Sequence, residues 1–174
     1  MNLPDIKIKK ILYATDLSET AVHAFAYASS LADKYGAGIT ILHVLAQPPG
    51  EEFILNMIDT DTWKQIKTRH YSEARDKIIG KKRDHVALRE VLEAFSEKAK
   101  TQVENQNFVT DEILIKSGAA AETIVQTAQD RQCDLIVMGT HGQGVIADIL
   151  MGSTAKWVVR HSPIPVLVIR LPRE

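Results

Sequence analysis

The sequence of 174 residues contains a single cysteine, Cys133, so an intrachain disulfide is excluded. A fold without disulfides agrees with a reducing compartment, and we expect the protein to be cytoplasmic. Cys133 stands at a predicted turn from a helix to a strand, where we expect it to be buried for structural reasons. Redox or nucleophilic use of this thiol is the alternative.

Long apolar runs and a strong net charge are also absent. No run approaches the roughly 20 apolar residues of a membrane span, and residues 1–7 lack the charged and then apolar pattern of a signal peptide. A formal net charge of −1 gives no general attraction to nucleic acid or to an anionic membrane, so we expect neither as a partner. With 45% hydrophobic and 25% charged residues, positions 1–174 are expected to form one globular domain.

Both standard phosphate-binding loops are missing. No segment fits the P-loop pattern G-x-x-x-x-G-K-[ST], and Gly142-Gln-Gly144 is followed by Val-Ile-Ala, which breaks the Rossmann pattern G-x-G-x-x-G. The chain instead has Gly139-x-x-Gly142, then nine residues, then Gly152-Ser153, directly after an apolar strand. Glycine lets a backbone approach a ligand closely, a helix start can hold phosphate oxygens, and open α/β sheets bind ligands where such strands end. We interpret this stretch as a cradle for nucleotide phosphates.

Apolar runs and helical periodicity alternate along the chain. Five strands are predicted, at residues 8–14, 39–45, 108–116 (interrupted after Val109), 134–138 and 164–169. Helices are predicted from the end of the first strand to Tyr35, over 119–132 and over 154–160. This alternation predicts an α/β layer fold with a parallel sheet. A proline at the start of the last strand favours an edge position for that strand.

The connection between the second and third predicted strands is unusually long. Residues 47–106 carry mostly helical patterns, among them an apolar stripe formed by Val91, Leu92, Phe95, Ala99 and Val103. One helix would be enough to join two parallel strands. We expect the extra helical material to cap one end of the sheet or to supply a contact surface.

The first helix has two candidate N-caps. Asp16 precedes Glu19 by three residues, which is the spacing of a capping box with aspartate in place of Ser or Thr. Ser18 is the competing cap. The sequence leaves the choice between them open.

Several strand ends together carry a resemblance to a known family. The segments are Ala14-Thr15-Asp16, His43-Val44, Met138-Gly139-Thr140-His141-Gly142, Gly152-Ser153-Thr154 and Pro163–Val168. In sequence and spacing they resemble the universal stress protein family, and the resemblance extends across the chain apart from the long crossover. It implies a three-layer Rossmann-like fold of the adenine nucleotide alpha hydrolase-like type. The implied sheet has five mainly parallel strands in the order 3-2-1-4-5.

The resemblance also implies a ligand. Family members that keep the full glycine pattern tend to bind ATP, and this chain keeps it; Mg²⁺ usually accompanies a triphosphate. An aspartate and a valine of the family meet the adenine and ribose, and the glycine loop holds the phosphates. The implied nucleotide-binding residues are Ala14, Thr15, Asp16, Val44, Met138, Gly139, Thr140, His141, Gly142, Gly152, Ser153 and Thr154. The last strand, Val166–Ile169, is implied to form a homodimer.

Each of these positions also has a structural explanation. Asp16 is justified by a helix cap alone, which is worth about 1 kcal/mol. The glycines can serve as turn residues, and Ser153 and Thr154 can cap the last helix. His43 and Trp157 are expected to have structural roles in packing.

We expect an ATP-binding, nucleotide-dependent regulator of the stress response that acts through an unidentified protein partner, and not a true enzyme. Two alternatives stay open. Slow ATP hydrolysis or phosphoryl transfer would need a residue that positions the attacking group, and His141 and Asp148 are the only suggestive candidates. A nucleotide-free interaction module would use the long crossover as its working surface.

Overall fold

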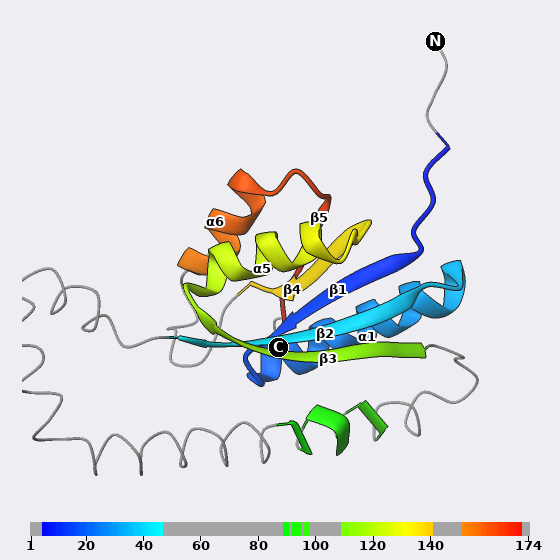
Figure 1. Ribbon diagram of the computed structural model, residues 1–174, viewed down its shortest axis with the longest axis horizontal. Coiled ribbons are helices and arrows are strands. Elements are labelled where there is room, and N and C mark those ends of the chain that lie inside the picture. The colour runs from blue at the N-terminus through cyan, green and yellow to red at the C-terminus, as the bar shows by residue number, and fades with distance from the viewer. Residues whose placement is uncertain are drawn as a thin grey trace, which may run out of the picture.

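A five-stranded sheet lies at the centre of the computed structural model (Figure 1), which describes residues 5–46, 89–90, 92–94, 96–97, 109–140 and 151–171. The strands are β1 (Lys10–Thr15), β2 (Gly38–Ala46), β3 (Val109–Gly118), β4 (Leu135–Gly139) and β5 (Val166–Ile169). Each pair of neighbouring strands is parallel, and the order is β3-β2-β1-β4-β5. The predicted α/β fold, the 3-2-1-4-5 order and the edge position of the last strand are therefore confirmed.

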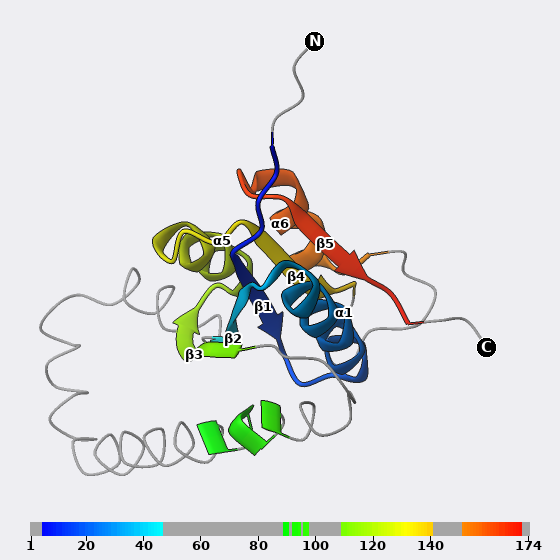
Figure 2. The same ribbon diagram turned by 90° about the vertical axis from the view of Figure 1, so that its right-hand side faces the viewer.

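Helices cover both faces of the sheet, as Figure 2 shows. They are α1 (Glu19–Tyr35) on one face, and α5 (Ala120–Asp130) and α6 (Ser153–His161) on the other. Strand β1 shows why both faces must be covered. Ile11 and Tyr13 belong to the core beneath α1, whereas Leu12 and Ala14 belong to the core beneath α5 and α6. Successive side chains of a strand point to opposite faces, so a central strand without polar alternation needs an apolar layer on each side.

Several element ends differ from the prediction by one or two residues. Helix α5 ends at Asp130 and not at position 132, because Gln132 has a φ of 54°, which is not helical. Strand β5 begins at Val166 and not at Ile164, because the hydroxyl of Ser162 bonds both the N–H (3.0 Å) and the C=O (2.7 Å) of Ile164 in a local turn. The predicted interruption of the third strand is wrong as well, since β3 is continuous across a register shift opposite Ile39 and Thr40.

The long crossover is described only in part. Residues 89–90, 92–94 and 96–97 are helical, as predicted, and Leu92 is completely buried in the core beneath α1. The other four residues of the predicted apolar stripe lie outside the described residues. In the part of the chain that the structure describes, no helix combines the length and apolarity that crossing a membrane requires.

The sheet contains one topological switch point. From β1 the chain continues to β2 on one side, whereas β4, the other neighbour of β1, continues to β5 on the opposite side. Ligands of open α/β sheets bind in the crevice at the carboxyl ends of the two strands that flank such a point. Here those ends are Thr15 of β1 and Gly139 of β4, within two of the segments singled out in the sequence.

Candidate functional site

The turn from β1 into α1 is held by its own side chains. The N–H of Leu17 donates to Thr15 Oγ1 (3.0 Å), the N–H of Ser18 donates to Asp16 Oδ1 (3.0 Å), and the N–H of Ala21 donates to Ser18 Oγ (3.3 Å). Ser18 is therefore the N-cap of α1, which decides between the two candidates that the sequence left open. The carboxylate of Asp16 instead accepts the hydrogen bond from the backbone N–H of Ser18, two residues later, which is the pattern of an Asx turn. These bonds orient Asp16, which is half-buried, at the carboxyl end of the central strand.

Leu17 lies in the middle of this turn with a φ of 63°, in the left-handed region that non-glycine residues rarely adopt. Its side chain packs against the core beneath α1. A glycine would relax the backbone but lose this packing. The turn next to Asp16 is thus held in an unfavourable conformation by the contacts around it.

His43 connects the end of β2 to this turn. It is the ladder partner of Thr15, and its Nδ1 lies 2.9 Å from the Thr15 carbonyl oxygen. A carbonyl oxygen only accepts, so Nδ1 carries the hydrogen. Burial lowers the pKa of His43, against the raising effects of the Thr15 bond and the Asp16 charge. A structural role was predicted for His43, but its link to Thr15 depends on the register between β1 and β2, which the sequence of one strand does not reveal.

The lowered pKa of His43 predicts a pH dependence of stability. Between the folded pKa and about 6.5, the unfolded chain binds more protons, so the free energy of unfolding should fall as pH drops through this window. His43→Asn keeps a donor for Thr15 but does not titrate. Urea unfolding from pH 8 to pH 5 should therefore show a shallower loss for the variant than for the wild-type protein. If the free energy of unfolding falls equally steeply with pH in both proteins, His43 is not the cause, because the other histidines titrate in both.

Val44 follows His43 at the end of β2. It pairs with Lys116 of β3, but the ladder between β1 and β2 ends one residue earlier, at Thr15 and His43. Val44 therefore has no β1 partner among the described residues. Its side chain packs against the core beneath α5 and α6, so a ligand at this edge would meet its backbone.

Gly139 ends β4 directly against the first turn of α1. A Cβ built on Gly139 would lie 2.9 Å from Thr20 Cγ2 and 3.3 Å from the backbone nitrogen of Ala21. The absence of a side chain at Gly139 is thus needed for this close helix–strand contact. Phosphate binding and a turn role were both predicted for this glycine, whereas the packing requirement stands independently of any ligand.

A backbone bond ties the start of α6 to β4. The N–H of Gly152 donates to the carbonyl of Thr140 (2.8 Å), whose own N–H donates to the carbonyl of Ile169 in β5 (2.8 Å). Gly152 is the N-cap of α6 and offers no side-chain cap, and the first turn of α6 contains no acidic residue. The predicted capping by Ser153 or Thr154 is wrong, since both lie inside the helix. The first amides of α6 have no acceptor within the helix, and its positive dipole end lies beside β4.

The predicted site residues that the structure describes fall into three groups. Ala14 and Met138 are ladder partners, and both side chains are buried in the core beneath α5 and α6. The remaining described residues lie at the carboxyl edge, in one group around β1 and β2 and another around β4 and α6: Thr15, Asp16, Val44, Gly139, Thr140, Gly152, Ser153 and Thr154. His141 and Gly142 lie outside the described residues.

Comparison with models of protein families shows to which family the chain belongs. The model of the Universal stress protein family matches residues 7–170. The chain belongs to this family. The resemblance found in the strand ends is thereby confirmed over nearly the whole sequence.

Relatives in this family match the full length of the chain. The universal stress protein MJ0577 of Methanocaldococcus jannaschii is 28% identical over 172 residues, which cover 95% of this chain and 96% of that protein. Its solved structure superposes with a TM-score of 0.61 over 97% of this chain and 100% of that one. The universal stress protein UspA of Lactobacillus plantarum is 26% identical, with a TM-score of 0.58 over 95% of this chain and 100% of that one.

Two further universal stress proteins share the fold and were solved with an adenine nucleotide. One is a complex with cAMP (20% identical, TM-score 0.56, covering 94% of this chain and 97% of that one). The other, from Archaeoglobus fulgidus, is a complex with dAMP (18% identical, TM-score 0.55, covering 95% of this chain and 99% of that one). The universal stress protein fold therefore accommodates such ligands in these relatives.

Cys133 and Trp157 have structural roles in this universal stress protein. Cys133 is buried, as predicted, and burial raises the pKa of its thiol to about 11, so the reactive thiolate is scarce at neutral pH. Trp157 packs against the core and stacks on His161 with ring centroids 4.2 Å apart. Among the residues that the structure describes, no three His, Cys, Asp or Glu side chains gather as metal ligands.

Proposed function

We propose that this chain is a cytoplasmic, ATP-binding universal stress protein that acts as a nucleotide-dependent regulator of the stress response. One observation carries the proposal. The N-terminus of α6, which has no side-chain cap among the described residues, is tied through Gly152 and Thr140 to the carboxyl end of β4, beside the switch point of the sheet. Helix N-termini of this kind favour phosphate groups.

The residues at the carboxyl edge fit the two ends of an adenine nucleotide. Asp16 offers carboxylate oxygens to ribose hydroxyls or to the adenine amine, and the backbone at Val44 lies where the β1 ladder has ended. The segment from Gly139 to Thr154, with His141 and Gly142, would hold the phosphates. Bound ATP would supply a polyphosphate charge that a partner protein can sense, and Mg²⁺ would enter with it. Binding would shift the population of conformations that the partner meets.

A thermal melt tests this function. Mg-ATP at about 100 times Kd should stabilise the fold by roughly 2.7 kcal/mol, which corresponds to about 5–10 °C for a chain of this size. Unchanged melting with millimolar Mg-ATP, ADP and AMP would overturn the proposal. If ATP stabilises the fold, measuring ADP after prolonged incubation separates a regulator from a slow ATPase, and we expect negligible turnover.

A matched pair of variants separates the two roles of Asp16. Asp16→Asn keeps an oxygen for the Ser18 N–H but loses the charge and one acceptor, so stability should hold while ATP affinity falls by about tenfold, or 1.4 kcal/mol. Asp16→Ala removes the turn bond as well and should also cost about 1 kcal/mol of stability. Calorimetric titration and urea unfolding give the two quantities. If Asp16→Asn binds ATP with wild-type affinity, the only role of Asp16 is to hold the turn between β1 and α1.

The partner proposed for β5 is a second copy of the chain. β5 is an edge strand, and Val166, Leu167 and Val168 are each half-buried. Pairing with its copy across a two-fold axis would cover the apolar edge. Sedimentation equilibrium at micromolar concentration should give the mass of a dimer, and a strictly monomeric mass would contradict the pairing.

A further inference from the structure

Thr15 was predicted to bind the nucleotide, yet its side chain is almost completely buried. Its exposed fraction is 6%, and the alternation of side chains along β1 places it on the face of the sheet that α1 covers, together with Ile11 and Tyr13. A side chain with so little surface has little to offer a ligand. The bonds that Thr15 makes within the protein lie instead around its neighbour, Asp16.

Both peptide groups that flank the Cα of Asp16 are held by bonds to Thr15. The peptide before Asp16 contains the Thr15 carbonyl, which accepts the Nδ1 hydrogen of His43 (2.9 Å). The peptide after Asp16 contains the Leu17 N–H, which donates to Thr15 Oγ1 (3.0 Å). Because each peptide group is planar, the orientations of these two groups determine φ and ψ of Asp16. The two bonds therefore fix the direction in which the Asp16 side chain leaves the backbone.

The bond from the Leu17 N–H to the Thr15 hydroxyl also supports the unfavourable backbone of Leu17. A φ of 63° costs free energy for a leucine, so the turn keeps this conformation only while its contacts hold it. A change of φ at Leu17 would move the Ser18 N–H that follows. That N–H donates to Asp16 Oδ1 (3.0 Å) and orients the carboxylate. The Thr15 hydroxyl thus acts on the Asp16 side chain as well as on its backbone.

The Thr15 hydroxyl is itself held by β1. Burial raises the pKa of the Tyr13 phenol, and a side-chain hydrogen bond with Thr15 lowers it in part. The phenol in turn donates to the carbonyl of Ala21 (2.6 Å) in the first turn of α1. The hydroxyl that holds the turn is therefore linked through Tyr13 to the start of the helix.

We propose that the Thr15 hydroxyl is a positioning group of the nucleotide site: it holds the Leu17 N–H, keeps the turn in its left-handed conformation and so presents the Asp16 carboxylate to the nucleotide without touching it. This inference rests on the proposed function for its ligand, an adenine nucleotide. If about one tenth of the molecules kept the turn without the hydroxyl, ATP would bind about tenfold more weakly. Asp16 makes the contact, and Thr15 orients it.

Thr15→Val tests the hydroxyl, because valine keeps the branched shape and cannot accept a hydrogen bond. In the nucleotide-free protein, NMR should show amide exchange about tenfold faster at Leu17 and Ser18 than in the wild type. Calorimetric titration should show ATP binding about tenfold weaker. Thr15→Ser keeps the hydroxyl, and should restore most of the affinity and the slow exchange even though a buried methyl group is lost.

A double-mutant cycle distinguishes positioning from an independent contact. Asp16→Asn is expected to weaken ATP binding about tenfold, and two independent losses of this size would multiply to about a hundredfold. Because Thr15 acts through Asp16, the double variant of Thr15→Val and Asp16→Asn should stay close to about tenfold. A loss of about a hundredfold in the double variant would overturn the proposal.

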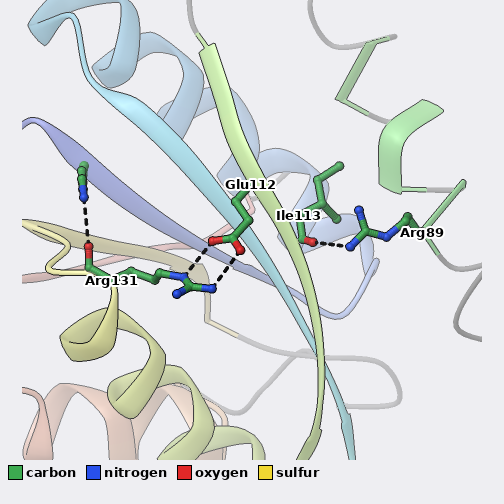
Figure 3. A network of polar contacts seen from close by, with 5 residues as sticks. Arg89, Glu112, Ile113 and Arg131 are labelled. Atoms are coloured by element: carbon green, nitrogen blue, oxygen red, sulfur yellow. Dashed lines mark hydrogen bonds and ion pairs between the residues drawn. The ribbon is translucent and has the colours of Figure 1, made fainter.

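The control variant lies among the polar contacts of β3 that Figure 3 shows. Arg131, which follows α5, binds Glu112 twice, with Nε–Oε2 at 2.7 Å and Nη2–Oε1 at 2.8 Å, and Arg89 Nη2 donates to the Ile113 carbonyl at 3.0 Å. Glu112→Gln keeps the side-chain shape and removes the ion pair, and should bind ATP within about twofold of the wild type. If it binds as weakly as Thr15→Val, the loss reflects a general loosening of the sheet and the proposal is wrong.

The remaining outcomes separate this inference from the proposed function. Absence of ATP binding by the wild type would overturn both. If the wild type binds ATP and Asp16→Asn binds it weakly, wild-type affinity or unchanged Leu17 exchange in a folded Thr15→Val would overturn this inference alone. If Thr15→Val fails to fold, Thr15→Cys supplies only a weak acceptor and should bind ATP more weakly than Thr15→Ser. Equal affinity of those two variants would contradict the proposal.

Discussion

Tyr13→Ala is expected to lower the free energy of unfolding by about 3–5 kcal/mol, the usual cost of removing a buried aromatic side chain. Tyr13 is completely buried in β1, and its ring meets Phe25 of α1 edge to face at a centroid distance of 4.9 Å. Its hydroxyl donates to the carbonyl of Ala21 at 2.6 Å. Burial raises the pKa of this hydroxyl, which therefore stays protonated and keeps donating.

Tyr13→Phe separates the bond from the ring. It keeps the aromatic contact but removes the hydroxyl, and should cost about 1 kcal/mol. Tyr35→Ala, at a position 50% exposed, is the surface control and should change stability by less than about 0.5 kcal/mol. Urea unfolding measures all three variants. A loss below 1 kcal/mol for Tyr13→Ala would mean that the contact between β1 and α1 does not have the geometry described.

Ser153→Asp is expected to raise the stability of the nucleotide-free protein and to weaken ATP binding by more than tenfold. Ser153 is exposed in the first turn of α6, where a negative charge favours the helix dipole by about 0.3–1 kcal/mol. The same charge would repel phosphates placed at these amides. A tenfold loss corresponds to about 1.4 kcal/mol, well within the interaction of two charges a few ångströms apart. The two effects have opposite signs, which a general structural perturbation would not produce.

The controls vary the charge and the ligand. Ser153→Asn has nearly the shape of the aspartate variant without its charge, and should bind ATP within a few-fold of wild type. Adenosine lacks phosphates and should bind Ser153→Asp and wild type alike. Thermal melts without ligand and calorimetric titrations with ATP give both sides of the comparison. Undiminished ATP binding by Ser153→Asp would place the phosphates away from α6.

The strand order was predictable through the resemblance to a known family, because the features that carry this resemblance are displayed locally in the sequence. Apolar runs, helical stripes and the glycine spacing are each contained in short segments, and together they matched a family whose sheet order is known. The caps were less predictable. Asp16 and Ser18 are both good caps two residues apart, and the competition was decided by the Ser18 N–H turning back onto Asp16. Such a choice depends on backbone torsions, here the unusual φ of Leu17.

Contacts between distant segments were not predictable at all. The closeness of Gly139 to Thr20 follows from how α1 packs across β1 onto β4. The bond from His43 to Thr15 follows from the register of two strands, and the bond from Arg89 to Ile113 joins a polar helical position to an edge carbonyl. None of these contacts joins two apolar side chains, so hydrophobic periodicity carries no signal for them.

The first turn of α1 is fixed to the sheet from two directions, by the Tyr13 hydroxyl on β1 and by the bare backbone of Gly139 on β4. The Asp16 turn, which leads into this first turn of α1, is therefore held in place against β1 and β4 by the polypeptide itself. Such preorganisation lowers the conformational entropy lost on binding. At the proposed nucleotide site, a rigid edge of this kind would select ligands by how well they fit it and would adapt little to them.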